Sequence, residues 1–217
     1  MKKNFLVLGL GRFGGTLSTT LCQLGHEVVA VDVNAARVEM VKDLVTHAIQ
    51  ANITDERAVA QLGVRNFDCV AVCTGDDIRT SVLAVVMCKE YGAKYLICKA
   101  SDPLHEKLLY KTGADKVFQP EREGAARLAH SLVSPSVLDF IELSDTYSIS
   151  DVRLPKSWAG KSLAEMNVRV KYGFSVIALR RNGQIIITID PFAPLLQDDE
   201  LVIIGTNKDL SRIDTIK

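Results

Sequence analysis

The sequence has no excess charge of either sign and no hydrophobic run of transmembrane length. Its 217 residues include 26 Lys and Arg against 26 Asp and Glu. This balance removes the general electrostatic attraction that draws proteins to nucleic acids and anionic membranes. No apolar stretch approaches the roughly 20 residues that a transmembrane helix needs, and Met1-Lys2-Lys3 leads directly into a strand pattern instead of a signal-peptide core. We therefore expect a soluble cytoplasmic chain with no nucleic-acid partner and no direct membrane insertion.

Cysteines are few and lack the spacing of a redox or zinc motif. Most of them lie within apolar runs, where cysteine behaves as a small buried hydrophobic residue. The odd set contains no Cys-x-x-Cys pair and comprises Cys22, Cys69, Cys73, Cys88 and Cys98. The pattern favours free thiols in a reducing compartment over disulfides or a zinc site.

The motifs of common catalytic sites are also missing. The sequence has no HExxH, no GxSxG, no phosphate loop ending in Lys-Ser or Lys-Thr, and no carboxylate pair at a catalytic spacing. All four histidines lie before residue 135: His26, His47, His105 and His130. The second half therefore lacks the acid/base group that a dehydrogenase brings to its nicotinamide, and we expect no enzymatic activity.

A glycine-rich turn near the N-terminus is the strongest functional signal. The segment Gly9-Leu10-Gly11-Arg12-Phe13-Gly14-Gly15 follows an apolar run and precedes a helical pattern. Gly9 permits a tight turn, Gly11 leaves the backbone open to a pyrophosphate, and Gly14 lets the helix pack against the strand. The helix directs its unpaired N–H groups and positive dipole end at the phosphates.

An acidic residue follows at the distance that a dinucleotide site requires. The strand pattern 26–31 ends in Asp32, 18 residues beyond Gly14, where a carboxylate accepts hydrogen bonds from a ribose diol. A glycine motif alone is weak, because many glycine turns bind nothing. Strand, helix and acid together favour an adenine nucleotide, and Asp32 disfavours the 2′-phosphate of NADP.

Residues 1 to about 120 alternate between strand and helix patterns with short connections. This alternation predicts an α/β fold, a Rossmann-like parallel sheet covered on both faces with its ligand at the carboxyl ends of the strands. We expect strands at Asn4–Leu8, Glu27–Val31, His47–Gln50, Cys69–Cys73, Tyr95–Lys99 and Lys116–Phe118, and helices at Arg12–Leu24, Ala35–Asp43, Asp55–Leu62, Ile78–Tyr91 and Leu104–Thr112. The expected N-caps are Asn34, Thr54 and Asp76 or Asp77, and the expected C-terminal glycines are Gly25, Gly63, Gly92 and Gly113.

Polar residues at the predicted strand ends are further candidates for nucleotide contact. Asn52, next to Ile53, suits adenine or ribose, but it equally suits capping of its own loop. Gly75, after Thr74, would let a nucleotide lie over the fourth strand, or it simply forms a turn. Lys99 offers a charge to a phosphate, with a solvated strand end as its alternative. Arg12 faces the same phosphates, and a neighbouring carboxylate is its competing partner.

A helix from Glu121 to Leu132 precedes a change of pattern. Acidic residues in its first turn are normal complements of the helix dipole, and Ser134-Pro135-Ser136 marks a candidate boundary. The helix and residues 137–141 look amphipathic and suit a subunit or domain junction. The boundary is placed between domains 1–134 and 135–217.

The second domain is predicted to be a small α+β module for sensing or assembly. Short strands are expected at Tyr147–Leu154, Ser175–Arg180, Gln184–Thr188 and Glu200–Ile204, with helices at Ser162–Met166 and Asp209–Ile213. Asn182-Gly183 is typical of a hairpin turn.

With these residues placed, the chain resembles the KTN/RCK family, the soluble regulatory subunits of bacterial potassium transport systems of the KtrA and TrkA type. The resemblance covers nearly the whole chain. Besides the glycine turn, it rests on Val31–Asn34, Ile97–Ala100, Gly113–Asp115 with Gln119–Glu121, Asp145–Ile149 and Asn167–Gly173.

The resemblance implies a Rossmann-like RCK N-terminal domain joined through a crossover helix to an RCK C-terminal module. Such subunits form homodimers that assemble into a ring, often an octamer, under a membrane-embedded ion-translocating subunit. ATP and ADP favour different states of the ring in the Ktr type, and NAD or NADH binds some Trk-type members. The implied location is cytoplasmic and peripheral to the membrane.

The resemblance also implies roles for individual residues. Glu121 aligns with a glutamate near the γ-phosphates, where Mg²⁺ or Ca²⁺ bridges it to the nucleotide; Lys99 and His105 match nucleotide-contacting positions. The implied cofactor-binding set is Gly9, Gly11, Arg12, Phe13, Gly14, Asp32, Asn34, Asn52, Ile53, Thr74, Gly75, Lys99, His105 and Glu121. Some relatives bind cyclic di-AMP, for which the matching residues are Leu163, Asn167, Val168, Arg169 and Pro191.

We therefore predict a non-catalytic, nucleotide-sensing gating subunit for potassium flux. The main alternative is a small NAD-dependent oxidoreductase, which shares the glycine turn and the ribose acid. A redox-sensing transcriptional regulator would need a winged helix and a basic face, and neither is present in the sequence. ATP/ADP and NADH both present a ribose and a pyrophosphate, and Glu121 favours ATP.

Overall fold

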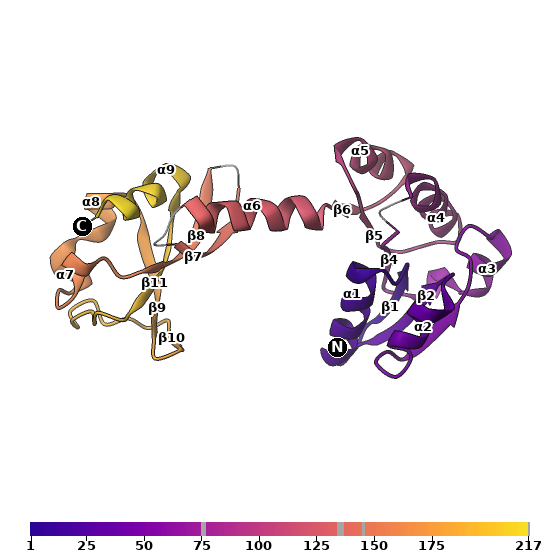
Figure 1. The fold of residues 1–217 in the computed structure, drawn as a ribbon, viewed down its shortest axis with the longest axis horizontal. Helices are drawn as coiled ribbons and strands as arrows, with labels where there is room; N and C mark the ends of the chain where they lie inside the picture. The colour runs from indigo at the N-terminus through magenta and orange to yellow at the C-terminus, as the bar shows by residue number, and fades with distance from the viewer. Residues whose placement is uncertain (75–76, 134–136, 145, 217) are drawn as a thin grey trace. The chain divides into compact units, whose positions relative to one another are not determined.

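The chain forms two compact units, Met1–Pro120 and Glu121–Lys217, in a computed structural model that describes residues 1–74, 77–133, 137–144 and 146–216 (Figure 1). Each unit has its own sheet and its own hydrophobic core. The division falls near the start of a long helix, and the predicted domain boundary after residue 134 stays a prediction. Within the described residues no helix is long and apolar enough to cross a membrane.

The first unit is a six-stranded parallel sheet with strand order β3-β2-β1-β4-β5-β6. This order confirms the predicted Rossmann-like fold. The strands are β1 (Asn4–Leu8), β2 (Glu27–Asp32), β3 (His47–Gln50), β4 (Cys69–Val72), β5 (Leu96–Lys99) and β6 (Lys116–Phe118). The helices are α1 (Arg12–Gln23), α2 (Ala35–Val41), α3 (Glu56–Gln61), α4 (Ile78–Glu90) and α5 (Pro103–Thr112), with a 3-10 turn at Val64–Asn66.

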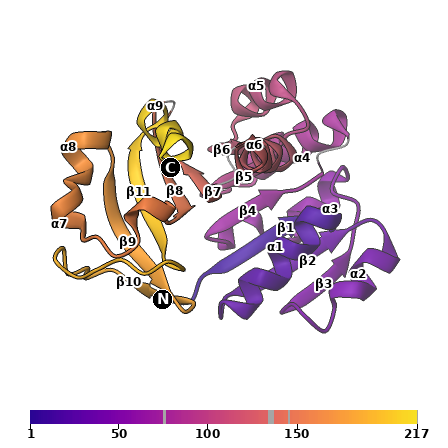
Figure 2. The same ribbon diagram turned by 60° about the vertical axis from the view of Figure 1, so that its left-hand side comes forward.

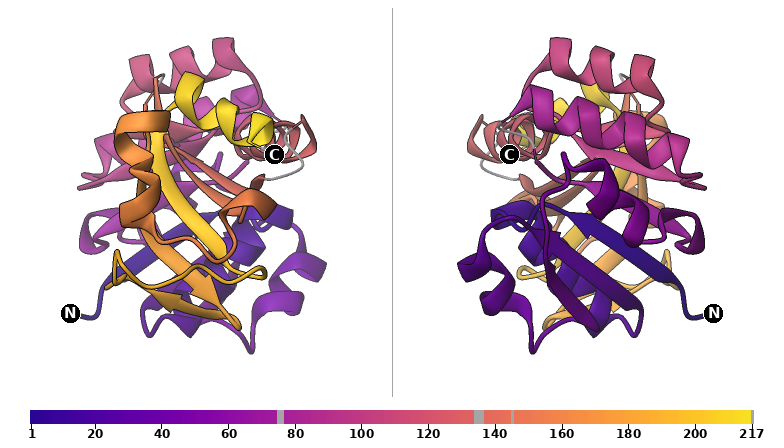
Figure 3. Two further views of the ribbon diagram at one scale, coloured as in Figure 1. Left: turned by 90° about the vertical axis from the view of Figure 1, so that its left-hand side faces the viewer. Right: turned by 90° about the vertical axis from the view of Figure 1, so that its right-hand side faces the viewer.

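Alternating side chains of the central strands fill two separate cores. Leu6 and Leu8 of β1 point into the core that α3, α4 and α5 cover, and Val7 between them points into the core under α1 and α2. All three are fully buried. Helices therefore lie on both faces of the sheet (Figures 2 and 3), which explains why these strands are apolar without interruption.

Caps fix the ends of the helices next to the carboxyl edge of the sheet. Asn34 caps α2, and Asp77 caps α4. The prediction of Thr54 as the cap of α3 is wrong: the Asp55 side chain accepts from the Arg57 N–H, because the helix starts one residue later. The four predicted C-terminal glycines all have positive φ. All five cysteines are free, and only Cys22 among them is not buried.

The second unit begins with the long helix α6 and continues as an antiparallel sheet of order β10-β9-β11-β8-β7. Its elements are α6 (Pro120–Val133), β7 (Val137–Glu142), β8 (Tyr147–Arg153), a 3-10 turn at Lys156–Trp158, α7 (Leu163–Met166), α8 (Val168–Tyr172), β9 (Ser175–Arg181), β10 (Gln184–Ile186), β11 (Glu200–Thr206), α9 (Asn207–Leu210) and a 3-10 turn at Ser211–Thr215. The predicted α+β module is confirmed. Strand β7 and helix α8 were not predicted.

Alternation along β8 and β11 places one face of this sheet against a core that contains Trp158, Phe174 and Leu201. Helix α7 starts with a capping box, in which Ser162 and Glu165 satisfy each other's backbone N–H groups. Asn167 follows at φ +45°, so α7 ends there and α8 begins in a new direction.

Candidate functional site

The candidate nucleotide site lies where the strand order reverses, between β1 and β4. The carboxyl ends of these neighbouring strands bring Gly9 and Thr74 together. A Cβ atom on Gly9 would lie 2.7 Å from Thr74 Cγ2, and Gly9 has φ +96°. Only glycine fits this position, because both its backbone conformation and its neighbour exclude a side chain.

The other two glycines of the turn differ sharply in their surroundings. A Cβ on Gly14 would lie 1.9 Å from the Gly9 carbonyl oxygen, so α1 packs directly on the turn that precedes it. A Cβ on Gly11 would meet nothing within 4 Å. The missing side chain of Gly14 thus serves helix packing, whereas that of Gly11 leaves the turn open.

Helix α1 presents its N-terminus at this open turn. Gly11 is its N-cap residue, without a side-chain cap, and the Gly15 N–H makes the first helical bond to the Gly11 carbonyl at 2.9 Å. The N–H groups between them have no intrahelical partner. Arg12 is exposed, and its guanidinium has no ion-pair partner among the described residues. The turn therefore offers several donors and a positive charge to an anion.

Asp32 is buried, at 4% exposure, and holds the glycine turn in place. Its Oδ2 accepts a hydrogen bond from the Leu10 N–H at 2.7 Å, and its Oδ1 accepts one from the Asn34 N–H at 2.8 Å. Arg37 lies 3.5 Å from Oδ2. A carboxylate has about four acceptor sites, so Asp32 retains capacity for a ribose hydroxyl. Its contact with Leu10 was not predicted, because a backbone N–H leaves no signal in the sequence.

Thr74 carries an unsatisfied polar atom beside the turn. Its Oγ1 is buried and has no hydrogen-bond partner, the one such side-chain atom among the described residues. Buried hydroxyl groups are nearly always paired in proteins, so this atom is suited to a ligand. The next candidate, Gly75, lies outside the described residues.

Two of the predicted polar contacts have local structural roles. The Asn34 side chain caps α2 by accepting from the N–H groups of Ala36 and Arg37. Asn52 accepts from both the N–H and the hydroxyl of Thr54, which is the loop-capping alternative. Their nucleotide contacts stay predictions.

Three other predicted residues border the same edge of the sheet. Ile53 is buried in the core under α4. The Phe13 ring packs on Phe118 with 4.9 Å between ring centroids, which fixes the first turn of α1 against the end of β6. Lys99, the half-buried last residue of β5, pairs in register with Phe118.

His105 is fully buried in the first turn of α5, with both ring nitrogens engaged. Its Nδ1 accepts from the Ser101 N–H at 3.2 Å, so Nε2 carries the proton and donates to Ser81 Oγ at 2.7 Å. The Ser81 hydroxyl donates in turn to the Ile78 carbonyl. Burial lowers the pKa of His105, and nearby Asp102 opposes this in part. The ring thus links α4 to α5, and its nucleotide contact stays a prediction.

Glu121 lies beyond the first unit, exposed in the first turn of α6 with Glu123. Among the described residues no three His, Cys, Asp or Glu side chains converge as a metal site. A cation at Glu121 would therefore take its further ligands from other sources, such as phosphate oxygens and water.

The residues predicted for a cyclic dinucleotide gather around α7 and α8. The Ala164 N–H donates to the Pro191 carbonyl at 2.8 Å, so Leu163 and Pro191 lie on adjacent segments. Val168 is buried in the core, and Arg169 is exposed beside it. The structure thus brings these segments together within one unit, and the ligand itself stays a prediction.

The chain is thus a two-domain protein of a nucleotide-binding class. Its first unit is Rossmann-like with an open glycine turn, and its second unit is a separate antiparallel sheet. The TrkA-N domain model matches residues 5–120, and the TrkA-C domain model matches residues 149–216. The chain therefore belongs to the TrkA-N/TrkA-C family, which confirms the resemblance inferred from the sequence.

Several relatives match over almost their full length. The chain is 39% identical over 214 residues to the Ktr system potassium uptake protein C of Bacillus subtilis, covering 99% of this chain and 97% of that protein. It is 39% identical over 212 residues to Ktr system potassium uptake protein A of the same organism, covering 98% and 96%.

A solved structure, the GsuK channel bound to NAD, has the same fold. It aligns with a TM-score of 0.67 at 19% identity, covering 100% of this chain and 39% of that one. The chain thus spans about two fifths of the channel's length, and the likeness concerns the fold alone.

Proposed function

We propose that this chain is a nucleotide-sensing regulatory subunit of a potassium uptake system of the Ktr type. The observation that carries the proposal is the match of both units to two Ktr potassium uptake proteins over nearly their entire lengths. The proposed role is regulatory, in keeping with the TrkA-N and TrkA-C domains that make up the chain.

The geometry of the glycine turn supports a nucleotide as the signal. Gly11 leaves open space for a pyrophosphate at the N-terminus of α1, and Arg12 is free to bind it. Asp32 has acceptor capacity for the ribose, and Thr74 Oγ1 lacks a partner that a ligand oxygen would supply. These residues fit a ribose and a pyrophosphate, which ATP, ADP and NADH share.

We propose ATP and ADP as the physiological pair, with NADH as the alternative. Two ligands switch a protein only if they bind its two conformations with different free energies. The γ-phosphate distinguishes ATP from ADP, and Glu121 with Mg²⁺ or Ca²⁺ is proposed to respond to it.

The proposed assembly is a homodimer that builds an octameric ring below a membrane-embedded potassium-translocating subunit, on the cytoplasmic side. Cyclic di-AMP is proposed as a second ligand at Leu163, Asn167, Val168, Arg169 and Pro191. The family membership supports both proposals.

The oxidoreductase alternative is not favoured. The relatives are potassium uptake proteins. His105, the histidine beside the carboxyl edge of the sheet, is buried with both nitrogens engaged and is poorly placed for proton transfer.

Titration of the purified chain with ATP, ADP and NADH, each with and without Mg²⁺ or Ca²⁺, tests the proposal. We expect ATP and ADP to bind and the divalent ion to strengthen ATP binding. If only NADH bound, and the protein turned over a substrate while it remained a dimer, the regulatory assignment would be refuted. Restored potassium uptake in cells that lack their own Ktr regulatory subunit would support it independently.

Arg12→Ala tests whether the free guanidinium serves the nucleotide. Loss of a charge-assisted hydrogen bond is expected to weaken ATP and ADP binding about tenfold or more, measured by isothermal titration calorimetry. Arg57→Ala is the matched control, since Arg57 is also exposed near the start of a helix. The ring is expected to stay assembled in both variants. Unchanged ATP affinity in Arg12→Ala would remove Arg12 from the site.

A further inference from the structure

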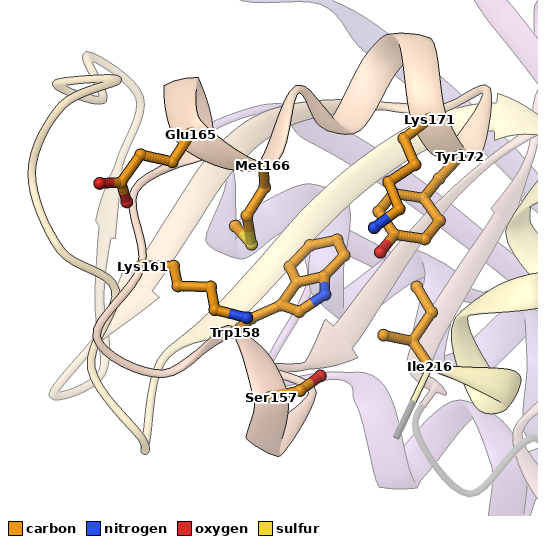
Figure 4. A pocket seen from close by; sticks show the side chains of 8 residues that line it. All are labelled: Ser157, Trp158, Lys161, Glu165, Met166, Lys171, Tyr172 and Ile216. Atoms are coloured by element: carbon orange, nitrogen blue, oxygen red, sulfur yellow. The ribbon is translucent and has the colours of Figure 1, made fainter.

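The second unit contains a pocket of about 860 Å³ that none of the proposed ligands uses. The turn at Lys156–Trp158, the helices α7 and α8, and Ile216 form its walls (Figure 4). The volume lies within the range of pockets that hold small organic ligands. The pocket is lined by Met166 and Glu165 of α7, whereas the proposed cyclic-dinucleotide contacts use Leu163 and Asn167 of that region.

Trp158 places an unused hydrogen-bond donor in this pocket. Its side chain is 2% exposed and is held by Tyr172 and Phe174, whose ring centroids lie 5.3 and 6.4 Å away. The indole N–H has no hydrogen-bond partner among the described residues. Among the described residues, Thr74 Oγ1 is the one side-chain polar atom that is both fully buried and without a hydrogen-bond partner. The indole nitrogen also lacks a partner, so it is not fully buried. Figure 4 shows the indole nitrogen directed toward Lys171, Tyr172 and Ile216.

The charges around the indole favour an anion. Lys161 and Lys171 both reach into the pocket, and neither has an ion-pair partner in the described structure. The Lys171 ammonium lies 5.2 Å from the centre of the Tyr172 ring. Glu165 is the one carboxylate in the lining; it is committed to the Ser162 N–H at 2.9 Å and points away from the indole in Figure 4. The pocket thus has donors and cations on the side of Trp158 and its acid on the other.

The apolar part of the lining favours a flat ring. Met166 contributes a polarisable thioether, Tyr172 an aromatic ring and Ile216 an aliphatic surface. Sulfur–aromatic and aromatic–aromatic contacts both favour conjugated ligands over bulky aliphatic ones. A ligand suited to this lining therefore combines a planar body with a negatively charged group.

We propose that this pocket binds a small planar organic anion, a flat ring that carries a carboxylate or a phosphate. The Trp158 N–H, the Tyr172 hydroxyl and the Lys171 ammonium hold the anionic group. The ring lies against Met166 and Ile216. None of its lining residues is among those proposed for the nucleotide.

Trp158 is the only tryptophan of the chain, so its fluorescence reports directly on the pocket of the full-length protein. Benzoate and phenyl phosphate serve as planar anions. Benzyl alcohol keeps the ring without the charge, and inorganic phosphate keeps the charge without the ring. We expect one or both planar anions to change Trp158 emission with a saturable dependence, and benzyl alcohol and inorganic phosphate to bind at least tenfold more weakly. Comparison of benzoate with phenyl phosphate distinguishes a carboxylate ligand from a phosphate ligand.

Variants connect the signal to the proposed donors. Lys171→Gln is expected to weaken binding about tenfold, and Tyr172→Phe about threefold, as expected for a charge-assisted and a neutral hydrogen bond. Lys208→Gln removes an exposed charge elsewhere in the same unit and is expected to have no effect. An Arg12→Ala background is expected to leave the response unchanged, which separates it from the nucleotide site. The proposal fails if neither planar anion saturates, if benzyl alcohol or inorganic phosphate binds equally well, or if Lys208→Gln has the same effect as Lys171→Gln.

Discussion

At the scale of single residues, the glycines of the turn meet two different requirements, which the sequence does not distinguish. Gly14 has no side chain because the Gly9 carbonyl occupies the space, at 1.9 Å from where a Cβ would lie. Gly11 has none although nothing lies within 4 Å of that position. The first absence is a condition of folding. The second has no structural cause within the described chain, which makes ligand access the reason we assign to it.

Alanine substitutions separate these two roles. Gly14→Ala is expected to destabilise the protein by about 2 kcal/mol, because overpacking against a backbone oxygen cannot be relieved by a side-chain rotation. Gly11→Ala is expected to change the unfolding free energy by less than about 0.5 kcal/mol, since φ −63° and ψ −174° suit alanine. It is expected to weaken ADP binding clearly. Urea unfolding and calorimetric titration measure the two effects; a stable Gly14→Ala, or a Gly11→Ala that binds ADP normally, would contradict this division.

The sequence predicts the residues of the turn better than their partners. Gly9, Gly11 and Asp32 are predicted because their spacing in the sequence is typical of sites that bind a pyrophosphate and a ribose. The role of Asp32 in holding the Leu10 N–H does not follow from the sequence, because it depends on the meeting of two strand ends. The same is true of Thr74, whose unsatisfied hydroxyl becomes evident only when its neighbours are known.

At the scale of secondary-structure elements, His105 connects the N-terminal turns of α4 and α5 to the end of β5. The ring is uncharged in this network, because Nδ1 must accept from the Ser101 N–H while Nε2 donates to Ser81. Protonation would place a second donor opposite the Ser101 N–H. The two helices beside the carboxyl edge of the sheet therefore depend on a neutral histidine.

This dependence predicts a loss of stability in mild acid. Burial lowers the pKa of His105 in the folded chain below its ordinary value of 6.5, so the unfolded chain binds a proton first as the pH falls through 6.5. More protons bound by the unfolded state means a lower unfolding free energy. We expect a loss of up to about 1 kcal/mol between pH 7.5 and pH 5.5, measured by urea unfolding.

Two variants assign this loss to the buried ring. His105→Gln is expected to be less stable at neutral pH but to lose the part of the pH dependence that belongs to residue 105. His47→Gln, at an exposed position on β3, is expected to keep it. An equal pH dependence in wild type and His105→Gln would show that other groups cause the acid sensitivity.

Element prediction succeeds where one periodicity dominates and fails where local and tertiary forces compete. The central parallel strands β1 and β4 are apolar runs because helices cover both faces of the sheet, so their pattern is strong. Strand β7 was interpreted only as an amphipathic junction, because it is an edge strand that pairs with β8 alone. Helix α8 is five residues long and starts after Asn167 in the left-handed conformation, so it has no periodicity of its own to detect.

At the scale of the whole molecule, the chain joins a unit whose glycine turn suits a nucleotide to a unit for which we propose other ligands. The Rossmann-like order of the first sheet follows from its alternating pattern, and the second sheet brings together segments that are distant in sequence, such as β8 and β11. Among the residues proposed for the nucleotide, Glu121 alone lies beyond the first unit. The role proposed for Glu121 therefore concerns switching between ATP and ADP by the whole chain, and not nucleotide binding at the glycine turn.

Replacement of Glu121 by Gln tests whether a divalent cation takes part in the difference between ATP and ADP. Because Mg²⁺ and Ca²⁺ prefer carboxylate oxygens, we expect Glu121→Gln to lose about tenfold in ATP affinity in the presence of the cation. ADP affinity, and ATP affinity in EDTA, are expected to stay unchanged. Glu123→Gln removes the same charge from the same first helical turn and is the matched control. Equal losses in both variants would assign the effect to the dipole of α6, and Glu121 would then have no part in holding a cation.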